Sequence, residues 1–284
     1  MNFKMQPSLA KIKFFVLLGF LLFQNAYSLH FIAYGDTRTG FDMHQIVVDA
    51  IAKQNPDLVL STGDLWDGYG PEKYKSIITK NTNLEKLLNQ NLFLVSRGNH
   101  ETLAEMLAFK PTLVRDSSEL YAFLKDNCFF ISLAMDPSKS TEFLEKALKS
   151  EKAKSAKWKF VYSHFPVYSS GTHASPGIPT VETLCDKYGV TIFISGHDHN
   201  YQRTHQIYGG KNVDTTSSLM AKNGTVYVVT GGGGAPLYPV VPATFSHSAE
   251  SINHYTDIST DDTKLIVRAV TAAGMVIDSF VIRM

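Results

Sequence analysis

Five short polar motifs, each shortly after an apolar run typical of a β-strand, constrain this chain more than any other feature. The apolar runs cover residues 31–34, 58–60, 92–95, 160–162 and 191–194. The motifs that follow them are Gly35-Asp36, Gly63-Asp64, Gly98-Asn99-His100-Glu101, Ser163-His164 and Gly196-His197-Asp198-His199. Because ligands of open α/β sheets bind outside the carboxyl ends of the strands, we expect these polar residues to meet at one edge.

The side chains of these motifs have the chemistry of a site for two metal ions. Two carboxylates, one amide oxygen and three imidazoles come from Asp36, Asp64, Asn99, His164, His197 and His199. Such donors suit hard to borderline cations, for which we expect iron, zinc or manganese. A metal pair favours attack of a metal-bound hydroxide on a phosphorus ester. A lone Gly-Asp pair or histidine would mean little, so the prediction rests on the motifs occurring together.

The motifs resemble those of the calcineurin-like metallophosphoesterases, and most of all the purple acid phosphatase branch. Two stretches carry the second part of this resemblance: Gly-His-Asp-His-Asn-Tyr-Gln-Arg at residues 196–203, and the glycine run at 231–234 followed by Ala-Pro-Leu. The similarity extends from about residue 29 to the C-terminus. It implies a metal-dependent phosphoric ester hydrolase of the acid phosphatase type, with two metal ions per chain.

The resemblance also implies how the metal ligands are shared. Asp64 would bridge both ions, Asp36 and His199 would complete the first site, and the second site would take Asn99, His164 and His197.

Three further residues would act on the substrate, according to the same resemblance. His100 would donate to the phosphoryl oxygens or to the leaving group, with Glu101 either orienting it or capping the next helix. His173 would face the substrate, with a solvated loop histidine as the alternative. Arg203 would support the pocket or touch the phosphate, with a structural arginine as the alternative.

Two positions depart from the family pattern at the first metal. Arg38 stands where many members have a histidine ligand, and Asp67 stands where purple acid phosphatases have a tyrosine. Arginine stays protonated and cannot ligate a metal. We expect Asp67 or water to replace the missing ligand. We expect Arg38 to lie at the pocket wall, where it either grips substrate phosphate or pairs with Asp67.

Strands alternate with helices in the first half of the chain, which predicts βαβ units and a largely parallel sheet. Apolar residues at helical spacing predict helices over residues 41–54, 72–89 and 141–148. In the last third, β-branched runs at residues 225–230, 265–269 and 275–282 predict a mixed or antiparallel second sheet. The expected fold is α/β, a four-layer α/β/β/α sandwich with two central mixed sheets.

The first 28 residues are typical of a signal peptide. Lys4, Lys11 and Lys13 precede an apolar run at residues 14–23, and Ala26-Tyr27-Ser28 fits cleavage after Ser28. A membrane anchor is the alternative, but a spanning helix needs about 20 apolar residues. We therefore expect an exported protein, secreted or periplasmic, with one catalytic domain at residues 29–284 and no membrane span after signal removal.

The net charge limits the classes of partner that this chain can bind. Removal of residues 1–28 takes three of the 27 basic residues and none of the 26 acidic ones, which leaves a net charge of −2. This balance gives no case for nucleic acid as a general partner, so we expect a small phosphoester substrate.

Export permits a disulfide between Cys128 and Cys185. Both lie in apolar stretches, and we favour two buried, unpaired thiols.

The sequence favours an exported phosphomonoesterase and leaves two alternatives open. The same core serves phosphodiesters or nucleotides, and specificity depends on loops that the motifs do not define. Arg38 and Asp67 also allow a weakened first site, in a metal- or phosphate-binding protein without activity.

Overall fold

Two seven-stranded sheets form the centre of the computed structural model, which describes residues 28–67, 69–109, 119–173 and 179–284. The first sheet contains β1 (Leu29–Tyr34), β2 (Leu58–Ser61), β3 (Phe93–Val95), β11 (Ser218–Met220), β14 (His254–Thr260), β15 (Lys264–Thr271) and β16 (Val276–Arg283). The second contains β4 (Tyr121–Lys125), β5 (Cys128–Ser132), β6 (Trp158–Tyr162), β7 (Ile192–Ser195), β8 (Tyr201–Thr204), β12 (Val226–Thr230) and β13 (Ser246–Glu250). The short strands β9 (Gln206–Tyr208) and β10 (Lys211–Asp214) pair separately.

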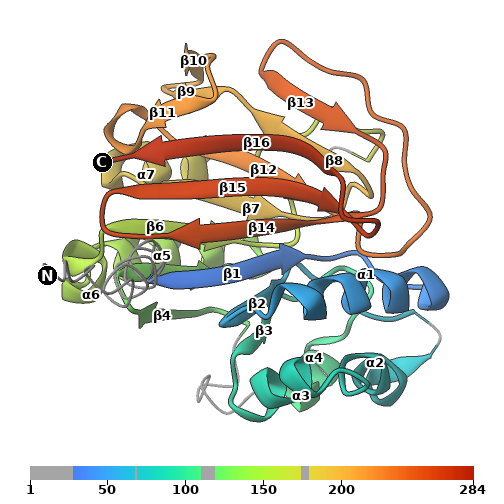
Figure 1. The fold of residues 1–284 in the computed structure, drawn as a ribbon. Coiled ribbons are helices and arrows are strands. Elements are labelled where there is room, and N and C mark those ends of the chain that lie inside the picture. Colours follow the sequence, from blue (N-terminus) through green and yellow to red (C-terminus); the bar gives the residue numbers. More distant parts are fainter. Residues whose placement is uncertain (1–27, 68, 110–118, 174–178) are drawn as a thin grey trace, which may run out of the picture.

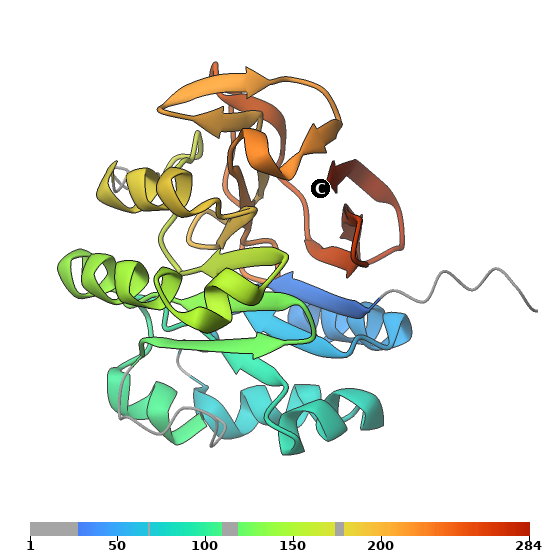
Figure 2. The ribbon, with the colours of Figure 1, turned by 90° about the vertical axis from the view of Figure 1, so that its left-hand side faces the viewer.

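Helices pack on the outer face of each sheet, although none lies over β15 and β16 in Figure 1, and the four-layer α/β/β/α sandwich is confirmed. The helices are α1 (Phe41–Gln54), α2 (Gly70–Ile78), α3 (Thr82–Asn89), α4 (Leu103–Phe109), α5 (Pro137–Leu148), α6 (Glu151–Ser155) and α7 (Pro179–Tyr188), with a 3₁₀ turn at Ala221–Asn223. Figure 2 shows the red strands β14 to β16 on the opposite side of the molecule from the green helix α5 and the yellow helix α7.

Alternating side chains along the strands divide the core into three apolar layers. Phe31 of β1 points between the sheets, where its ring packs edge-on against Phe160 of β6. Its neighbour Ile32 points the other way, into the layer that holds Val47 of α1. Phe193 of β7 lies in the third layer, under α5 and α7. The motif strands are buried on both faces of their sheets, which explains why their sequences are continuous apolar runs.

The strands of the last third are divided between the two sheets, so their expected assignment to one second sheet is wrong. β14 pairs antiparallel with β1, and β15 and β16 extend the first sheet from there. β12 instead lies parallel to β7 in the second sheet. Both sheets are mixed, with orders β11-β16-β15-β14-β1-β2-β3 and β13-β8-β12-β7-β6-β5-β4. The β-branched pattern predicts a strand but carries no information about its distant partner.

Two of the predicted helices occur as expected, and the third is divided. α1 matches residues 41–54, and α5 covers residues 141–148 but begins earlier, where the side chain of Asp136 caps the backbone N–H groups of Ser138 and Lys139. The helix predicted over residues 72–89 ends at Ile78 and restarts after Asn81, whose backbone is extended. The break lets α2 and α3 each present its own apolar face to the core.

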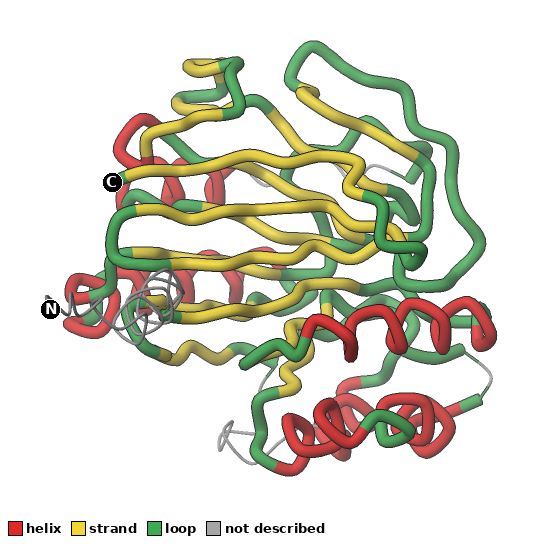
Figure 3. The backbone as a smooth tube through the Cα atoms, viewed as in Figure 1, coloured by secondary structure: helices red, strands yellow, loops and turns green. Residues whose placement is uncertain are grey.

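Several other expectations concern the chain as a whole. Cys128 and Cys185 are buried, unpaired and in different apolar layers, as favoured from the sequence. Within the described ranges, no helix has the length and apolar character needed to cross a membrane. The expected signal peptide lies outside the described residues except for Ser28. A long loop between β12 and β13, green in Figure 3, begins with the glycine run at residues 231–234.

Candidate metal centre

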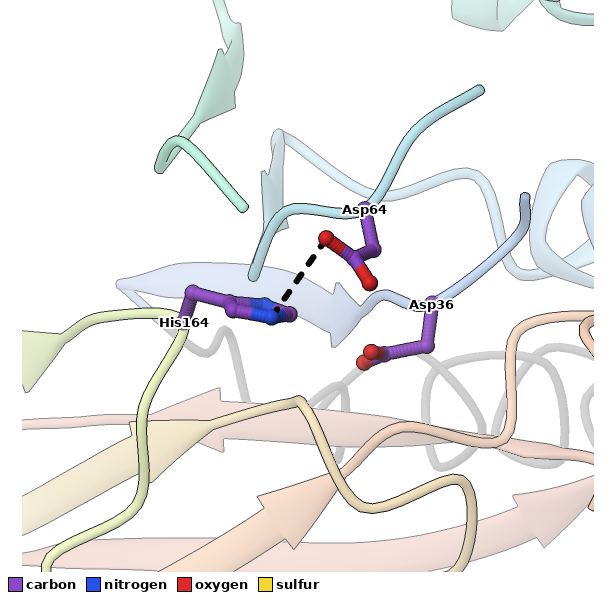
Figure 4. A group of neighbouring side chains, drawn as sticks. All are labelled: Asp36, Asp64 and His164. Atoms are coloured by element: carbon purple, nitrogen blue, oxygen red, sulfur yellow. Dashed lines mark ion pairs between the residues drawn. The ribbon is translucent and has the colours of Figure 1, made fainter. Parts of the chain in front are cut away.

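The five motif loops leave the carboxyl ends of strands from both sheets. β1, β2 and β3 are parallel in the first sheet, and β6 and β7 are parallel in the second. Asp36 and Asp64 come from the first sheet and His164 from the second, yet ligand atoms of the three lie within 4.8 Å of one another (Figure 4). The polar residues therefore meet as expected, but across the two sheets and not along the edge of one.

Four of the predicted ligands form a tight group on the second-sheet side. His164 Nε2 lies 2.8 Å from Asn99 Oδ1 and 3.4 Å from Asp64 Oδ1. His197 Nδ1 lies 3.2 Å from His164 Nε2 and 3.1 Å from Asn99 Oδ1. These are the four donors expected around the second metal, and they all point into one small volume.

The remaining two predicted ligands lie beside this group. His199 Nε2 is 3.6 Å from Asp36 Oδ1. Both oxygens of Asp36 accept the backbone N–H of His197, at 2.9 and 3.1 Å, so the first and last motifs are joined directly. Burial and the neighbouring Asp64 carboxylate raise the pKa of Asp36 well above its ordinary range. A cation between the two carboxylates would relieve this repulsion.

Hydrogen bonds on the far side of two imidazole rings determine which nitrogen is free. His164 Nδ1 donates to the Thr62 carbonyl at 2.9 Å, and His199 Nδ1 donates to the Pro236 carbonyl at 2.7 Å. Burial lowers the pKa of both histidines to about 4, so both are neutral near pH 7. Each Nε2 therefore directs a lone pair at a carboxylate oxygen. Acceptors facing acceptors in a buried site fit a bound metal cation, with the backbone carbonyls fixing the tautomers.

Two motif glycines are required because other residues pass too close for a side chain. A Cβ atom on Gly98 would lie 2.1 Å from Asp64 Oδ1 and 2.2 Å from the Asp64 backbone nitrogen. A Cβ atom on Gly196 would lie 2.3 Å from Asp36 Oδ2. The glycine in each motif thus makes room for a carboxylate of another motif.

Glu101 has a different role from the two that were expected. Its buried carboxylate accepts three backbone N–H groups, at 3.1, 2.6 and 2.8 Å, from Asp64, Leu65 and Gly98. It thereby ties the second and third motif loops together. Burial and Asp64 raise its pKa to about 7. The cap of α4 is formed by Thr102 and Glu105, which bond to each other's backbone N–H groups at 2.8 and 3.2 Å.

A cavity of about 160 Å³ opens over the candidate metal centre. It is lined by Arg38, Asp64, Asn99, His100, His173, His197, His199 and Tyr238. The structure thus brings His100, His173 and Arg38 to the cavity, as the sequence predicted. Asp67 stands beside two of them, with Oδ2 3.4 Å from His100 Nδ1 and 3.5 Å from Arg38 Nη1. Its predicted role as a replacement metal ligand stays a prediction.

Tyr238 lines the cavity and was not identified from the sequence. Its ring stacks on His199, with centroids 4.0 Å apart, and lies 4.1 Å from the ring of His173. Arg38 Nη2 donates to its hydroxyl at 3.1 Å. The glycine run brings this segment to the site, because Gly233 N bonds to Gly35 O at 2.8 Å. That run was the only sequence signal, and it indicates a close backbone approach without naming the tyrosine.

Asp198, between the two histidine ligands, points away from the predicted metal pair. Its carboxylate accepts the Ser169 hydroxyl and, at 3.0 Å, the backbone N–H of His173. This pairing holds the loop of His173 over the cavity.

Arg203 does not appear among the described residues that line the cavity. Its side chain is buried and forms two bonds to the Asp278 carboxylate, from Nε at 2.6 Å and from Nη2 at 3.0 Å. The guanidinium also lies 4.5 Å from the ring centre of Phe280. The structure places Arg203 between the sheet strands β8 and β16, which corresponds to the structural alternative and gives no support for a phosphate contact.

Comparison with known families gives one decisive match. The calcineurin-like phosphoesterase family matches residues 29–201, which is more than half of the chain. The chain belongs to this family. Its predicted membership, with similarity to the purple acid phosphatase branch, is therefore confirmed.

Individual relatives are more distant. A nucleotide pyrophosphatase/phosphodiesterase of barley (Hordeum vulgare) is 35% identical over 107 residues, covering 34% of this chain and 29% of that protein. A probable inactive purple acid phosphatase of Arabidopsis thaliana is 35% identical over 106 residues, covering 34% of this chain and 17% of that protein. These matched segments span less than a third of the relatives' length.

A solved structure shares the fold over most of the chain. The purple acid phosphatase from yellow lupin (Lupinus luteus) seeds superimposes with a TM-score of 0.74 at 21% identity. The match covers 90% of this chain and 53% of the lupin chain. The chain therefore has the fold of the lupin protein and spans about half of its length.

Proposed function

We propose that this phosphoesterase is a binuclear-metal phosphohydrolase acting mainly on phosphomonoesters. The observation that carries the proposal is the pair of neutral imidazoles whose Nε2 lone pairs face buried carboxylates, at His164 and His199. When bound, two metal ions would lower the pKa of a water nucleophile and neutralise the phosphoryl oxygens. Asp64 would serve both ions, Asp36 and His199 the first, and Asn99, His164 and His197 the second.

The remaining cavity residues have roles in binding and proton transfer. His100 lines the cavity, with Nδ1 3.4 Å from Asp67 Oδ2 and Nε2 3.9 Å from Asp64 Oδ2, and as a general acid it would give a proton to the leaving oxygen. Arg38 offers a guanidinium, which binds phosphate oxygens through parallel hydrogen bonds. His173, held over the cavity by Asp198, would contact the phosphoryl group from the opposite loop.

Two features of the cavity favour a monoester. Its volume of about 160 Å³ is smaller than the roughly 300–1,000 Å³ of sites that enclose a whole drug-sized ligand. It therefore suits a terminal phosphoryl group, with the rest of the ester outside. The fixed positive charge of Arg38 also favours a doubly charged monoester over a singly charged diester.

The name of the barley relative supports a second candidate, hydrolysis of phosphodiesters or nucleotides. A panel of an aryl phosphate, a methyl aryl phosphate and a nucleotide, assayed with Mn, Fe, Zn or no metal, separates the two. We expect metal-dependent release of inorganic phosphate, fastest from the monoester. Faster cleavage of the diester would select the second candidate, and no cleavage with any metal would refute both.

The Arabidopsis relative is described as probably inactive, so a binding protein without activity is the rival in a different class. The retained donor set argues for activity, and the same panel decides between the two.

We also propose that the protein is exported and cut after Ser28, on the strength of the charged and apolar segments at its N-terminus. Mass spectrometry of the extracytoplasmic protein should then find Leu29 as its first residue. An intact Met1 on that protein would contradict cleavage.

A further inference from the structure

The two oxygens of Asp64 face opposite sides of the candidate metal centre. Oδ1 lies 3.4 Å from His164 Nε2, on the side of the second site. Oδ2 lies 3.2 Å from Arg38 Nε and 3.9 Å from His100 Nε2. A carboxylate that bridges two metals gives one oxygen to each. The oxygen on the first-site side is therefore the one that the guanidinium already contacts.

Contacts at three nitrogens hold the guanidinium of Arg38 at this position. Nε lies 3.2 Å from Asp64 Oδ2, Nη1 lies 3.5 Å from Asp67 Oδ2, and Nη2 donates to the Tyr238 hydroxyl at 3.1 Å. The side chain is 18% exposed, so water screens it only partly. Arg38 is thus a fixed cation and not a freely moving surface side chain.

The tyrosine that anchors Arg38 is itself fixed. The ring of Tyr238 makes an angle of 10° with the ring of His199 and 31° with that of His173, at centroid distances of 4.0 and 4.1 Å. Two rings this close and this nearly parallel to a third must lie on its opposite faces. Tyr238 therefore stands between the two histidines and ties the position of Arg38 to a predicted ligand of the first metal.

We infer that Arg38 competes with the first metal ion for Asp64, so that the two metal sites fill in order, the second tightly and the first weakly. The inference rests on the proposed binuclear centre. A fixed positive charge repels a dication beside it, and arginine cannot escape this by losing its proton. The second site uses the other oxygen of Asp64 together with the neutral donors Asn99, His164 and His197, so its affinity depends much less on Arg38.

Calorimetric titration of the chelator-treated protein with Mn²⁺ tests this order. We expect two binding steps whose dissociation constants differ by at least about tenfold, which is about 1.4 kcal/mol. Arg38→Met removes the charge and should tighten the weak step by about tenfold while leaving the strong step unchanged. Arg38→Lys is the matched control, because it keeps the charge and should keep the two steps apart. Arg38→Gln is a second neutral variant, for use if the methionine variant does not fold.

Two results would overturn the inference: equal steps in the wild-type protein, or equal shifts of the weak step in the lysine variant and the neutral variants. Equal shifts would mean that the shape of the loop, and not the charge, sets the affinity. The hydrolysis assay tests the proposed activity independently of the order of metal binding. Ordered filling without hydrolysis would refute the proposed activity and support the inference, whereas hydrolysis with equal steps would do the reverse.

Discussion

Three of the predicted ligands have backbone conformations that residues other than glycine rarely adopt. Asp36, Asp64 and His197 have φ angles of 59°, 52° and 71°, all in the left-handed region. Such a conformation costs of order 1–3 kcal/mol at each residue and tends to occur at functional sites, where the surrounding structure enforces it. Glu101 is part of that surrounding structure, because it holds the backbone N–H of Asp64. The backbone strain is therefore located at residues that we propose as metal ligands.

At the same scale, His100→Ala should keep the metals and lose turnover. The side chain of His100 faces the cavity while its backbone N–H bonds to Asp64 Oδ1 at 3.1 Å, a contact that alanine retains. Loss of a general acid of this kind lowers kcat by about 10²–10⁴-fold. Steady-state kinetics together with metal analysis checks the prediction. Loss of metal from the variant would show instead that His100 is a ligand.

At the scale of the elements, the motif loops depend on close packing of one backbone against another. Gly98→Ala would force a methyl group into Asp64, so we expect the second motif loop to shift and metal affinity to fall sharply. Overpacking of this kind typically costs about 1–3 kcal/mol of stability. Urea unfolding and metal analysis of the purified variant measure the two effects.

Gly189→Ala is the matched control for this change. Gly189 has φ +64° and open space around its Cβ position, so alanine there meets only backbone strain of about 1–2 kcal/mol. We expect that variant to lose stability and keep its metal. If both glycine variants retained metal equally, the close packing would not be what positions Asp64.

The helices and strands also show which features of the fold and of the site can be predicted from the sequence. Apolar runs and the polar residues after them are local signals, and they predicted the motif strands and the residues that converge on the site. The partner of a strand is not local, which is why the expected sheet is wrong for β15 and β16. Tyr238 was not predicted as a site residue for the same reason. It contacts His199 only because the long loop after β12 brings it to the site. The bond between Glu101 and Leu65 likewise depends on how two distant loops pack.

At the scale of the whole molecule, two buried histidines outside the site should make stability depend on pH. Burial lowers the pKa of His44 to about 3 and that of His254 to about 4. An unfolded histidine takes up a proton below about pH 6.5, whereas these two stay neutral in the folded protein. The contribution of these two histidines to the free energy of unfolding is therefore fully present above about pH 6.5. It is lost as the pH falls toward 4, by up to about 1.4 kcal/mol per pH unit for each histidine.

His44→Phe isolates one of these contributions. The new ring can keep the stacking on Tyr74, while the Tyr34 hydroxyl keeps its bond to the Tyr74 hydroxyl at 3.1 Å. Urea unfolding between pH 6.5 and 4.5 should show a shallower loss of stability than in the wild-type protein. Parallel curves for the two proteins would mean that His44 is not responsible for the acid sensitivity.

The most direct test of the binuclear centre is the number of metal ions per chain after equilibrium dialysis against excess Mn²⁺. Asp64 is the proposed bridge between the ions and His199 serves one of them, so their variants should differ. We predict two ions for the wild-type protein, one for His199→Ala and almost none for Asp64→Asn. A wild-type protein that binds only one ion with Mn, Fe and Zn alike, or an Asp64→Asn variant that still binds two, would contradict the proposal.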